Sequence, residues 1–518
     1  MRNRKTNGGA VRVHQALLAL LTLGAALVSV AEPLPVDTIR QLSDEHRDAA
    51  IALYREFLSL PNDANYPDDI LRLVEWMDAA FVSRGFKVRR IDTPGSPLLL
   101  AERHESDNLP TVLVYLQSDG QPVDPSAWFQ EDPYTPVLKA PNPDGGYDRI
   151  PWELLDNAYD PDWRVFARSA SDSKGPMTQF LVAVELLDKA GFEADYNLKV
   201  IIDTEEEMGS PHLPEAVTEH RDDLAADLLL IFDGPPHPSN RPTVGFGARG
   251  IVTVTLVSYG PLVPQHSGHY GNFVPNPALH MSRILASMKS ADGRVTIPGF
   301  YDGIDIDATT RQVLEAVPDN EEKILADMGL IKADAVATTL QEAIQFPSLN
   351  IRGMSAGWVG KESRTIIPAT ANAELDIRLV KESDHEYLLH LVRSHIEDLG
   401  YHVVDHEPSM DERLANSDIV SFTHEFSYNA YRSDMDAIAG RMARAGMQHL
   451  YGEDPILIRT SGGSVPISPF VETLDIPAAK VPTVNIDNNQ HSPNENLRLG
   501  NFVEGIAILM SVLSQTPE

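Results

Sequence analysis

The stretch TVLVYLQSDGQPVDP, residues 111–125, decides the fold class. Its first six residues are mostly apolar, as in a short buried strand, and polar and turn residues begin at Gln117. Two runs of the same kind follow, LKVII at residues 198–202 and LLLIF at residues 228–232, and residues 177–190 have helical apolar spacing. Buried strands alternating with helices predict an α/β domain with a mostly parallel, helix-covered sheet.

Acidic residues follow each of the three predicted strands. Asp119 follows the first, the run DTEEE at residues 203–207 ends the second, and Asp233 follows the third. The carboxyl ends of parallel strands meet at one edge of a sheet, where ligands bind, and clustered carboxylates repel one another unless a cation lies among them. The chain has no cysteine, so its metal ligands must be His, carboxylate or amide groups. The pattern predicts a metal or acid–base site at this edge.

The pattern changes near residue 243. An alternating run at 251–257 is followed by helical segments near 277–289 and 309–327, and later by strand-like and helical segments at 371–379, 385–398 and 401–404. We therefore predict a smaller α+β domain over residues 243–408. It is inserted into the α/β domain and divides that domain into residues 32–242 and 409–518.

The amino-terminal segment has the features of a secretory signal peptide. Four basic residues precede an apolar run at residues 16–30, which ends in Ser29-Val30-Ala31. The run is shorter than the ~20 residues that span a bilayer, and small residues mark a cleavage position. We predict a signal peptide over residues 1–31, cleaved after Ala31, and a periplasmic or secreted protein without membrane association.

The composition excludes some function classes. The chain has 518 residues, with 42 basic and 75 acidic side chains and a formal net charge of −33. Such an excess of negative charge repels phosphate backbones, so no nucleic-acid partner is expected. A hydrophobic fraction of 42% is enough for a globular core.

Five ordered segments resemble the M20 metallopeptidases, in particular the carnosinase-like dipeptidase and aminoacylase branch. They are DGQPVDP at 119–125, ASDSKG at 170–175, EEEMGS at 205–210, HSG at 266–268 and QHSPNE at 490–495. The resemblance implies a catalytic domain that holds two divalent ions, Zn²⁺ in the first place, and an inserted lid domain that also forms a homodimer. It further implies hydrolysis of the amide bond of a small substrate with a carboxylate, either a dipeptide or an N-acyl amino acid.

The resemblance also implies roles for individual residues. Asp172 bridges the two ions, Glu207 and His491 complete one metal site, and Asp233 helps to form the other. Glu206 is the general base, supported by Asp119, and His266 reaches into the partner subunit's site to stabilise the oxyanion. The substrate carboxylate is bound by Arg378 and by a glycine-rich loop that includes Gly463 and Ser464.

Each of these residues also has a plain structural explanation. Asp172 fits a helix N-cap, the acids at 205–207 fit a solvated charge run, and Asp233 fits the start of a turn. His266 fits an exposed loop, and Arg378 fits a strand residue paired with Asp376 or Glu374.

Gln117 departs from the family pattern, which has a metal-binding histidine at this position. Three hypotheses follow. In the first, the Gln117 carbonyl oxygen binds the second ion while its amide donates to Asp119, and a harder ion such as Mn²⁺ is favoured there. In the second, the enzyme works with one ion held by Asp172, Glu207 and His491. In the third, the protein binds small peptides in the periplasm without turnover. We favour the first, because the other implied groups are all present.

Overall fold

The structure is a computed structural model, and it describes residues 32–518. The predicted signal peptide, residues 1–31, lies outside the described residues and stays a prediction. Among residues 32–518, no helix is both long enough and apolar enough to cross a bilayer.

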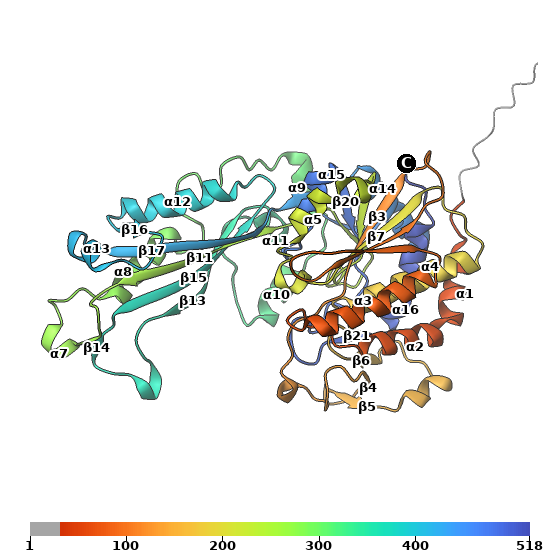
Figure 1. Ribbon diagram of the computed structural model, residues 1–518, viewed down its shortest axis with the longest axis horizontal. Helices are drawn as coiled ribbons and strands as arrows, with labels where there is room; N and C mark the ends of the chain where they lie inside the picture. Colours follow the sequence, from red (N-terminus) through yellow and green to blue (C-terminus); the bar gives the residue numbers. More distant parts are fainter. Residues whose placement is uncertain (1–31) are drawn as a thin grey trace, which may run out of the picture. The chain divides into compact units, whose positions relative to one another are not determined.

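An eight-stranded mixed sheet forms the centre of what we call the large domain (Figure 1). Its strands are, in order across the sheet, β1 (Lys87–Ile91), β2 (Leu98–Arg103), β7 (Asn197–Asp203), β3 (Thr111–Gln117), β8 (Leu228–Ile231), β20 (Ala478–Lys480), β9 (Thr243–Gly245) and β19 (Ile456–Ile458). The central strands β7, β3, β8 and β20 are parallel. β1 pairs antiparallel with β2, β2 with β7 and β9 with β20, whereas β19 is parallel to β9. The predicted α/β fold class is confirmed.

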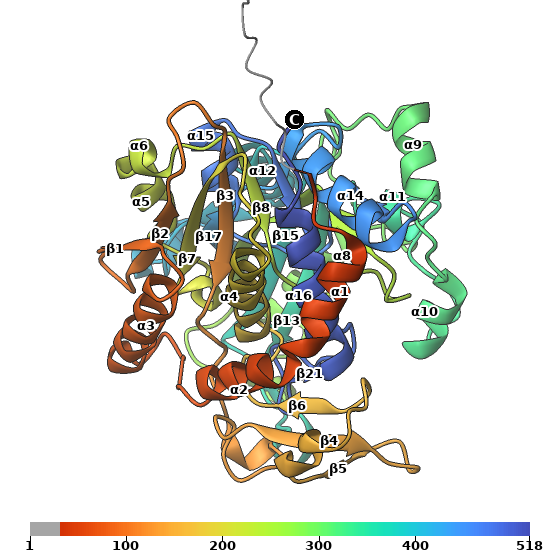
Figure 2. The same ribbon diagram turned by 90° about the vertical axis from the view of Figure 1, so that its right-hand side faces the viewer.

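Helices bury both faces of this sheet. Val112, Val114 and Leu116 of β3 point into the core on one face, and Leu113 and Tyr115 point into the core on the other, as the two-residue repeat of a strand requires. Figure 2 shows α4 and α16, which pack against each other on the first face. The first face is covered by α1 (Val36–Glu45), α2 (Arg47–Leu58), α3 (Pro67–Val82), α4 (Lys174–Lys189), α14 (Ile438–Tyr451) and α16 (Leu499–Leu513), and the second by α5 (Leu213–Glu219), α6 (Arg221–Leu224) and α15 (Ser468–Leu474).

A second sheet forms the separate small sheet domain (Figure 1). Val252, Val254 and Leu256 of its central strand are buried, and they pack beneath α8 (Pro277–Met288) and α12 (His385–Asp398) in one apolar cluster. Its strand order is β13 (Ser348–Ser355), β15 (Thr370–Leu379), β11 (Gly250–Tyr259), β17 (Ile419–Tyr428) and β16 (His402–Val404).

The strand pairing shows that both boundaries of the small sheet domain differ from the predicted ones. β17 pairs antiparallel with β11, so the small sheet domain includes residues beyond the predicted end at 408. At the other boundary, β9 belongs to the large sheet, so the small domain starts after residue 245. β17 escaped prediction because its second half, residues 423–427, is exposed and, apart from Phe426, polar, so the apolar alternation of a half-buried strand is absent there.

A four-stranded sheet of the large domain brings two distant segments together. β21 (Asn496–Arg498) pairs with β6 (Arg164–Phe166), which pairs with β4 (Val137–Pro141) and then β5 (Tyr147–Arg149). Because Asn496 lies opposite Phe166, the residues just before β21 lie beside those just after β6.

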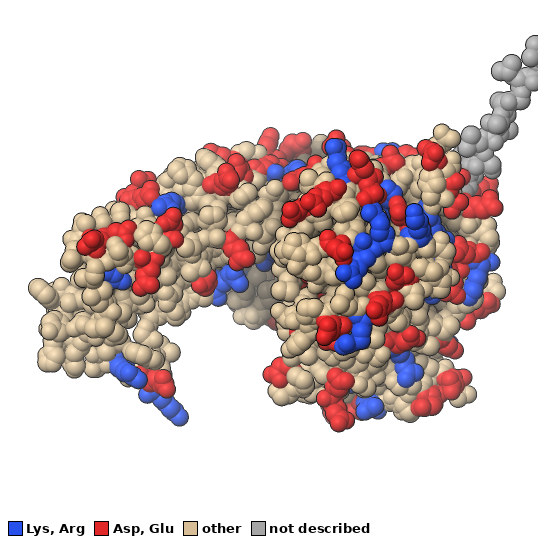
Figure 3. All heavy atoms as spheres, viewed as in Figure 1, with Lys and Arg blue, Asp and Glu red and all other residues tan. Residues whose placement is uncertain are grey.

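Acidic side chains are distributed over the face of the molecule that Figure 3 shows, with Lys and Arg side chains between them. This distribution agrees with the acidic composition of the whole chain.

Candidate active site

The carboxyl ends of three parallel strands carry the acidic residues of the site. Gln117 at the end of β3 lies opposite Asp203 at the end of β7, and Tyr115 of β3 lies opposite Ile231 of β8. The turns that follow these strands therefore lie side by side, and they place Asp119 and Asp233 at one edge of the sheet.

Asp119 orients the segment that follows β7. Its two carboxylate oxygens accept hydrogen bonds from the backbone N–H groups of Glu206 at 3.0 Å and Glu207 at 2.9 Å. Asp119 is 1% exposed, and burial together with the charges of Asp203 and Glu207 raises its pKa well above the usual value. The hypothesis that the Gln117 amide donates to Asp119 is wrong, because the Asp119 oxygens are occupied by these backbone groups and the amide donates elsewhere.

Asp172 is held by a buried carboxylate from the segment before β21. Glu495 Oε1 accepts the backbone N–H groups of Ser171 and Asp172, both at 2.9 Å. Its Oε2 atom accepts the Ser169 N–H and forms an ion pair with Arg168, both at 2.8 Å. The side chains of Arg168 and Glu495 are 3% and 1% exposed, so these contacts fix the loop that presents Asp172.

Replacing Glu495 by glutamine is expected to lower the free energy of unfolding by about 3 kcal/mol, because the variant leaves the Arg168 charge buried and unpaired. The matched control is Asp487→Asn, which removes the partner of Arg164 from the same segment but is 52% exposed. That change is expected to cost less than about 1 kcal/mol. Urea unfolding of both variants measures the difference, and equal losses would contradict the role of Glu495.

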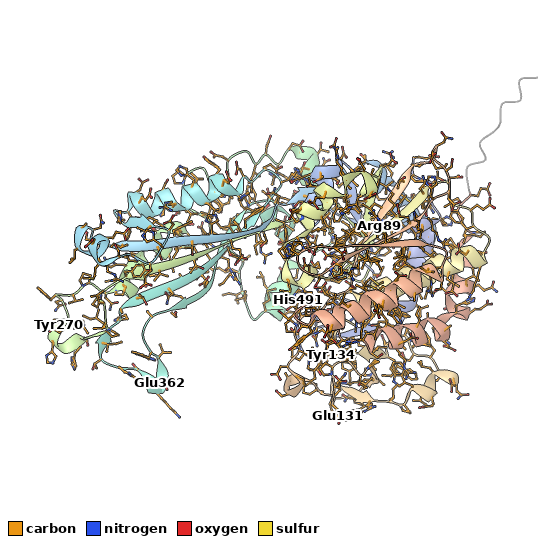
Figure 4. The ribbon with its side chains drawn as sticks, in the orientation of Figure 1. Arg89, Glu131, Tyr134, Tyr270, Glu362 and His491 are labelled. Carbon is orange, nitrogen blue, oxygen red and sulfur yellow. The ribbon has the colours of Figure 1, made fainter. Side chains whose placement is uncertain are left out.

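Asp172, Glu207 and His491 form a cluster that fits a metal ion. His491 Nε2 lies 3.0 Å from Asp172 Oδ2 and 3.3 Å from Glu207 Oε2. One ligand atom from each residue lies within 4.8 Å of the other two. Two carboxylates, one imidazole and an open position form a ligand set of the kind found in catalytic zinc sites. Figure 4 labels His491 in the large domain.

Burial and neighbouring charges raise the pKa values of three groups at the site. Burial and the charges of Glu207 and Asp172 raise the pKa of Glu206 well above its usual value. Burial and Asp172 raise the pKa of Glu207 to about 8, and the hydrogen bond to Asp172 raises the pKa of His491 to about 9. Binding of a metal ion by Glu207 and His491 would release the protons that these side chains carry.

The ligands predicted for a second ion are engaged with other groups. Gln117 Nε2 donates to Asp172 Oδ1 at 2.9 Å, and Gln117 Oε1 has no hydrogen-bond partner among the described residues. Asp233 Oδ1 accepts from Ser173 Oγ at 3.0 Å, and Asp233 Oδ2 accepts from Lys480 Nζ at 3.1 Å. Both Asp233 oxygens and Asp172 Oδ1 therefore have hydrogen-bond donors.

A pocket of about 770 Å³ contains these residues and opens onto the predicted substrate loop. Gln117, Asp172, Glu206, Asp233 and His491 line it together with Arg378, Gly463 and Ser464. Arg378 Nη1 donates to Ser464 Oγ at 2.7 Å, while its Nε atom lies 3.5 Å from Asp376 Oδ2. Arg378 therefore contacts both Asp376 and the glycine-rich loop that carries Ser464, and its role toward a substrate stays a prediction.

His266 lies apart from this cluster, in the small sheet domain. It is exposed in β12 (Gln265–His266), it accepts the Gly268 N–H at 3.0 Å, and its ring centroid lies 4.6 Å from that of His269. The next helix, α7 (Ser267–Tyr270), ends at Tyr270, which Figure 4 labels in that domain. His237 also lines the pocket, and its Nε2 atom lies 3.1 Å from Asp319 Oδ1.

Sequence reasoning missed Lys480, Gln121 and Gln490. Gln121 donates to Glu207 at 2.8 Å, and Gln490 donates to Asp172 at 3.3 Å. The two glutamines lie inside the motifs DGQPVDP and QHSPNE, but the sequence does not indicate which group an amide side chain contacts. Lys480 did give one, because a lysine at the end of the apolar run IPAAK, residues 476–480, needs an acidic partner when that strand is buried.

The family model for Peptidase family M20/M25/M40 matches residues 141–515. This chain belongs to that family. The predicted M20 resemblance is confirmed, and this M20 protein is an enzyme of the metallopeptidase class.

Three similar proteins cover nearly the whole M20 chain. The Cys-Gly metallodipeptidase of Schizosaccharomyces pombe is 23% identical over 501 residues, which are 93% of this chain and 98% of that protein. The human Beta-Ala-His dipeptidase is 24% identical over 521 residues, 95% of this chain and 96% of that protein. The solved structure of an M20 metallo-carboxypeptidase from Sulfolobus solfataricus has a TM-score of 0.75 and 25% identity, and the match covers 90% of this chain and 99% of that one.

Proposed function

We propose that this M20 enzyme is a metal-dependent dipeptidase acting on small substrates with a free carboxylate. The observation that carries the proposal is the position of Glu206 beside the cluster of Asp172, Glu207 and His491, in one pocket with Arg378. A base, a set of metal ligands and a guanidinium group for a carboxylate are the parts that this hydrolysis requires. Similar proteins named for Cys-Gly and Beta-Ala-His dipeptides support the substrate class.

The residues of the pocket divide the chemistry among them. A divalent ion, for which Zn²⁺ suits the ligands, acidifies water and polarises the scissile carbonyl when it is bound. Glu206 accepts a proton from the attacking water and then returns it to the leaving amine. Asp119 fixes the backbone of Glu206 and Glu207 throughout.

A panel of dipeptides and N-acetyl amino acids tests the function. We expect dipeptide hydrolysis that is lost after chelation and restored by Zn²⁺ or Mn²⁺. Hydrolysis of only the N-acetyl amino acids would indicate an aminoacylase. Peptide binding without turnover under every metal offered would support the alternative function, a binding protein that has lost catalysis.

Arg378→Met is expected to raise KM for dipeptides about 10- to 100-fold, because a charge-assisted hydrogen bond to the substrate carboxylate is lost. The matched control is a dipeptide with an amidated carboxyl end, whose KM should not change between the two enzymes. Steady-state kinetics with both substrates measures this difference, and an equal KM increase for both would contradict the carboxylate contact.

We also propose that the active enzyme is a homodimer in which His266 serves the partner's site. Two observations support this. His266 is exposed, and its described contacts are with its own segment and not with the pocket of its own chain. A histidine placed over the scissile carbonyl stabilises the oxyanion that forms there.

The export of the protein stays a proposal that rests on residues 1–31 alone, with their basic start, apolar run and Ser29-Val30-Ala31 pattern. Amino-terminal sequencing of the protein recovered from outside the cytoplasm is expected to begin at Glu32. An uncleaved chain would contradict export by this signal.

A further inference from the structure

We propose that the Lys480 ammonium group takes the place of the second metal ion, so that this enzyme binds one ion per chain. The proposal rests on the metal site of the proposed function, formed by Asp172, Glu207 and His491, and not on the identity of the substrate. In this arrangement, one metal ion and the side chain of Lys480 occupy the site in place of two metal ions.

The sheet delivers Lys480 to Asp233. Lys480 ends β20 and lies opposite Ile231 of the parallel strand β8, two residues before Asp233. Its Nζ atom reaches Asp233 Oδ2 at 3.1 Å, and the two side chains are only 18% and 11% exposed. With Ser173 on the other oxygen, both Asp233 oxygens have donors that a metal ion would have to displace.

Gly234 leaves the space that the ammonium group fills. Gly234 has a φ of +71°, and a Cβ atom on this residue would lie 2.8 Å from Lys480 Nζ. Any other residue at this position would therefore displace the ammonium group as well as strain the backbone. The turn after β8 is thus built to admit the lysine.

Gln117 provides a hydrogen-bond donor to Asp172, the residue predicted to bind both ions. An ionised carboxylate only accepts hydrogen bonds, so the amide must turn its NH₂ group toward Asp172, as observed at 2.9 Å. Asp172 Oδ1 thus has an N–H donor. Gln117 Oε1, which has no hydrogen-bond partner within residues 32–518, is the atom that a second ion would use, so the ion count tests the proposal directly.

The negative charges of the site explain why Lys480 and Gln117 occur together. The negative charges of Asp119, Asp172, Glu207 and Asp233 act on Glu206, and such a group of carboxylates needs positive charge near it. The ammonium group of Lys480 forms an ion pair with Asp233, and it would repel a divalent ion that competes for the same Asp233 oxygen. With Lys480 in this position no second ion binds. The histidine that would be a ligand of that ion is then not needed, and the neutral Gln117 stands in its place.

Elemental analysis of the whole purified chain, dialysed against Zn²⁺ or Mn²⁺, tests the proposal. We expect about one ion per chain for the wild type and about two for the double variant Gln117→His/Lys480→Met, which restores an imidazole and removes the ammonium group. Lys480→Arg, which keeps the charge, and Lys199→Met, which changes a lysine of β7 away from the site, should each retain about one. Electron paramagnetic resonance of the Mn²⁺-loaded chains should give the spectrum of an isolated ion for the wild type and of a coupled pair for the double variant.

Two ions per chain in the wild type would overturn the role of Lys480 whether or not the variants fold. One ion in a correctly folded double variant would also overturn it. No ion under either metal would overturn the proposed function together with this inference, whereas one ion without dipeptide hydrolysis would contradict the proposed function alone.

Discussion

Replacing Glu206 by glutamine is expected to lower kcat for dipeptide hydrolysis roughly 10²- to 10⁴-fold, because glutamine keeps the size of the side chain but cannot accept the proton of the attacking water. The bound metal should be unaffected, since the ion is held by Asp172, Glu207 and His491. Steady-state kinetics and metal content, both measured on the same preparation, separate loss of the base from loss of the ion.

The preceding residue provides a matched control. Glu205 belongs to the same acidic run, but its carboxylate accepts the backbone N–H of Ser96 at 3.0 Å and does not line the pocket. Glu205→Gln should therefore keep most of the activity. If Glu206→Gln hydrolysed dipeptides as fast as Glu205→Gln, the assignment of the general base would be wrong.

Mixing two inactive variants is expected to restore activity, if each site takes His266 from the partner subunit. Glu206→Gln lacks the base, and His266→Ala lacks the oxyanion donor, which is expected to cost roughly 10²- to 10³-fold in kcat. In a mixed dimer, the chain with Glu206 intact receives His266 from the other chain, so one of the two sites is complete. Random exchange of subunits should recover about a quarter of the wild-type activity per chain.

His390→Ala is the control for this experiment, because His390 is an exposed histidine of α12 in the same domain. That variant should be active by itself. Activity of the mixture no greater than the sum of its parts, with subunit exchange verified by mass spectrometry, would show that His266 does not act across a dimer.

The sequence allowed the fold class and the family to be predicted, because both depend on local patterns. The buried strands at 111–116, 198–202 and 228–232 are continuous apolar runs, and their ends had to meet if the strands were parallel. The motifs around Asp172, Glu207 and His491 then named the metal ligands that the structure brings together.

The rest depended on contacts between residues far apart in the chain. Lys480 and Asp233 are separated by 247 positions, and no local pattern connects them. The contacts of Gln117 were likewise unreadable, since an amide shows neither its orientation nor its partner in a sequence. β17 was assigned to the wrong domain because an exposed half-strand has no apolar alternation.

The contact between Glu495 and the Asp172 loop has a consequence for biosynthesis. Asp172 and His491 are 319 positions apart, and the carboxylate that holds the Asp172 loop lies four residues beyond His491. While the ribosome is still synthesising the small sheet domain, the emerged part of the chain has neither the histidine nor the clamp. A nascent chain therefore cannot capture its ion, and it becomes a hydrolase only after residue 495 has left the ribosome and packed against the first half of the large domain.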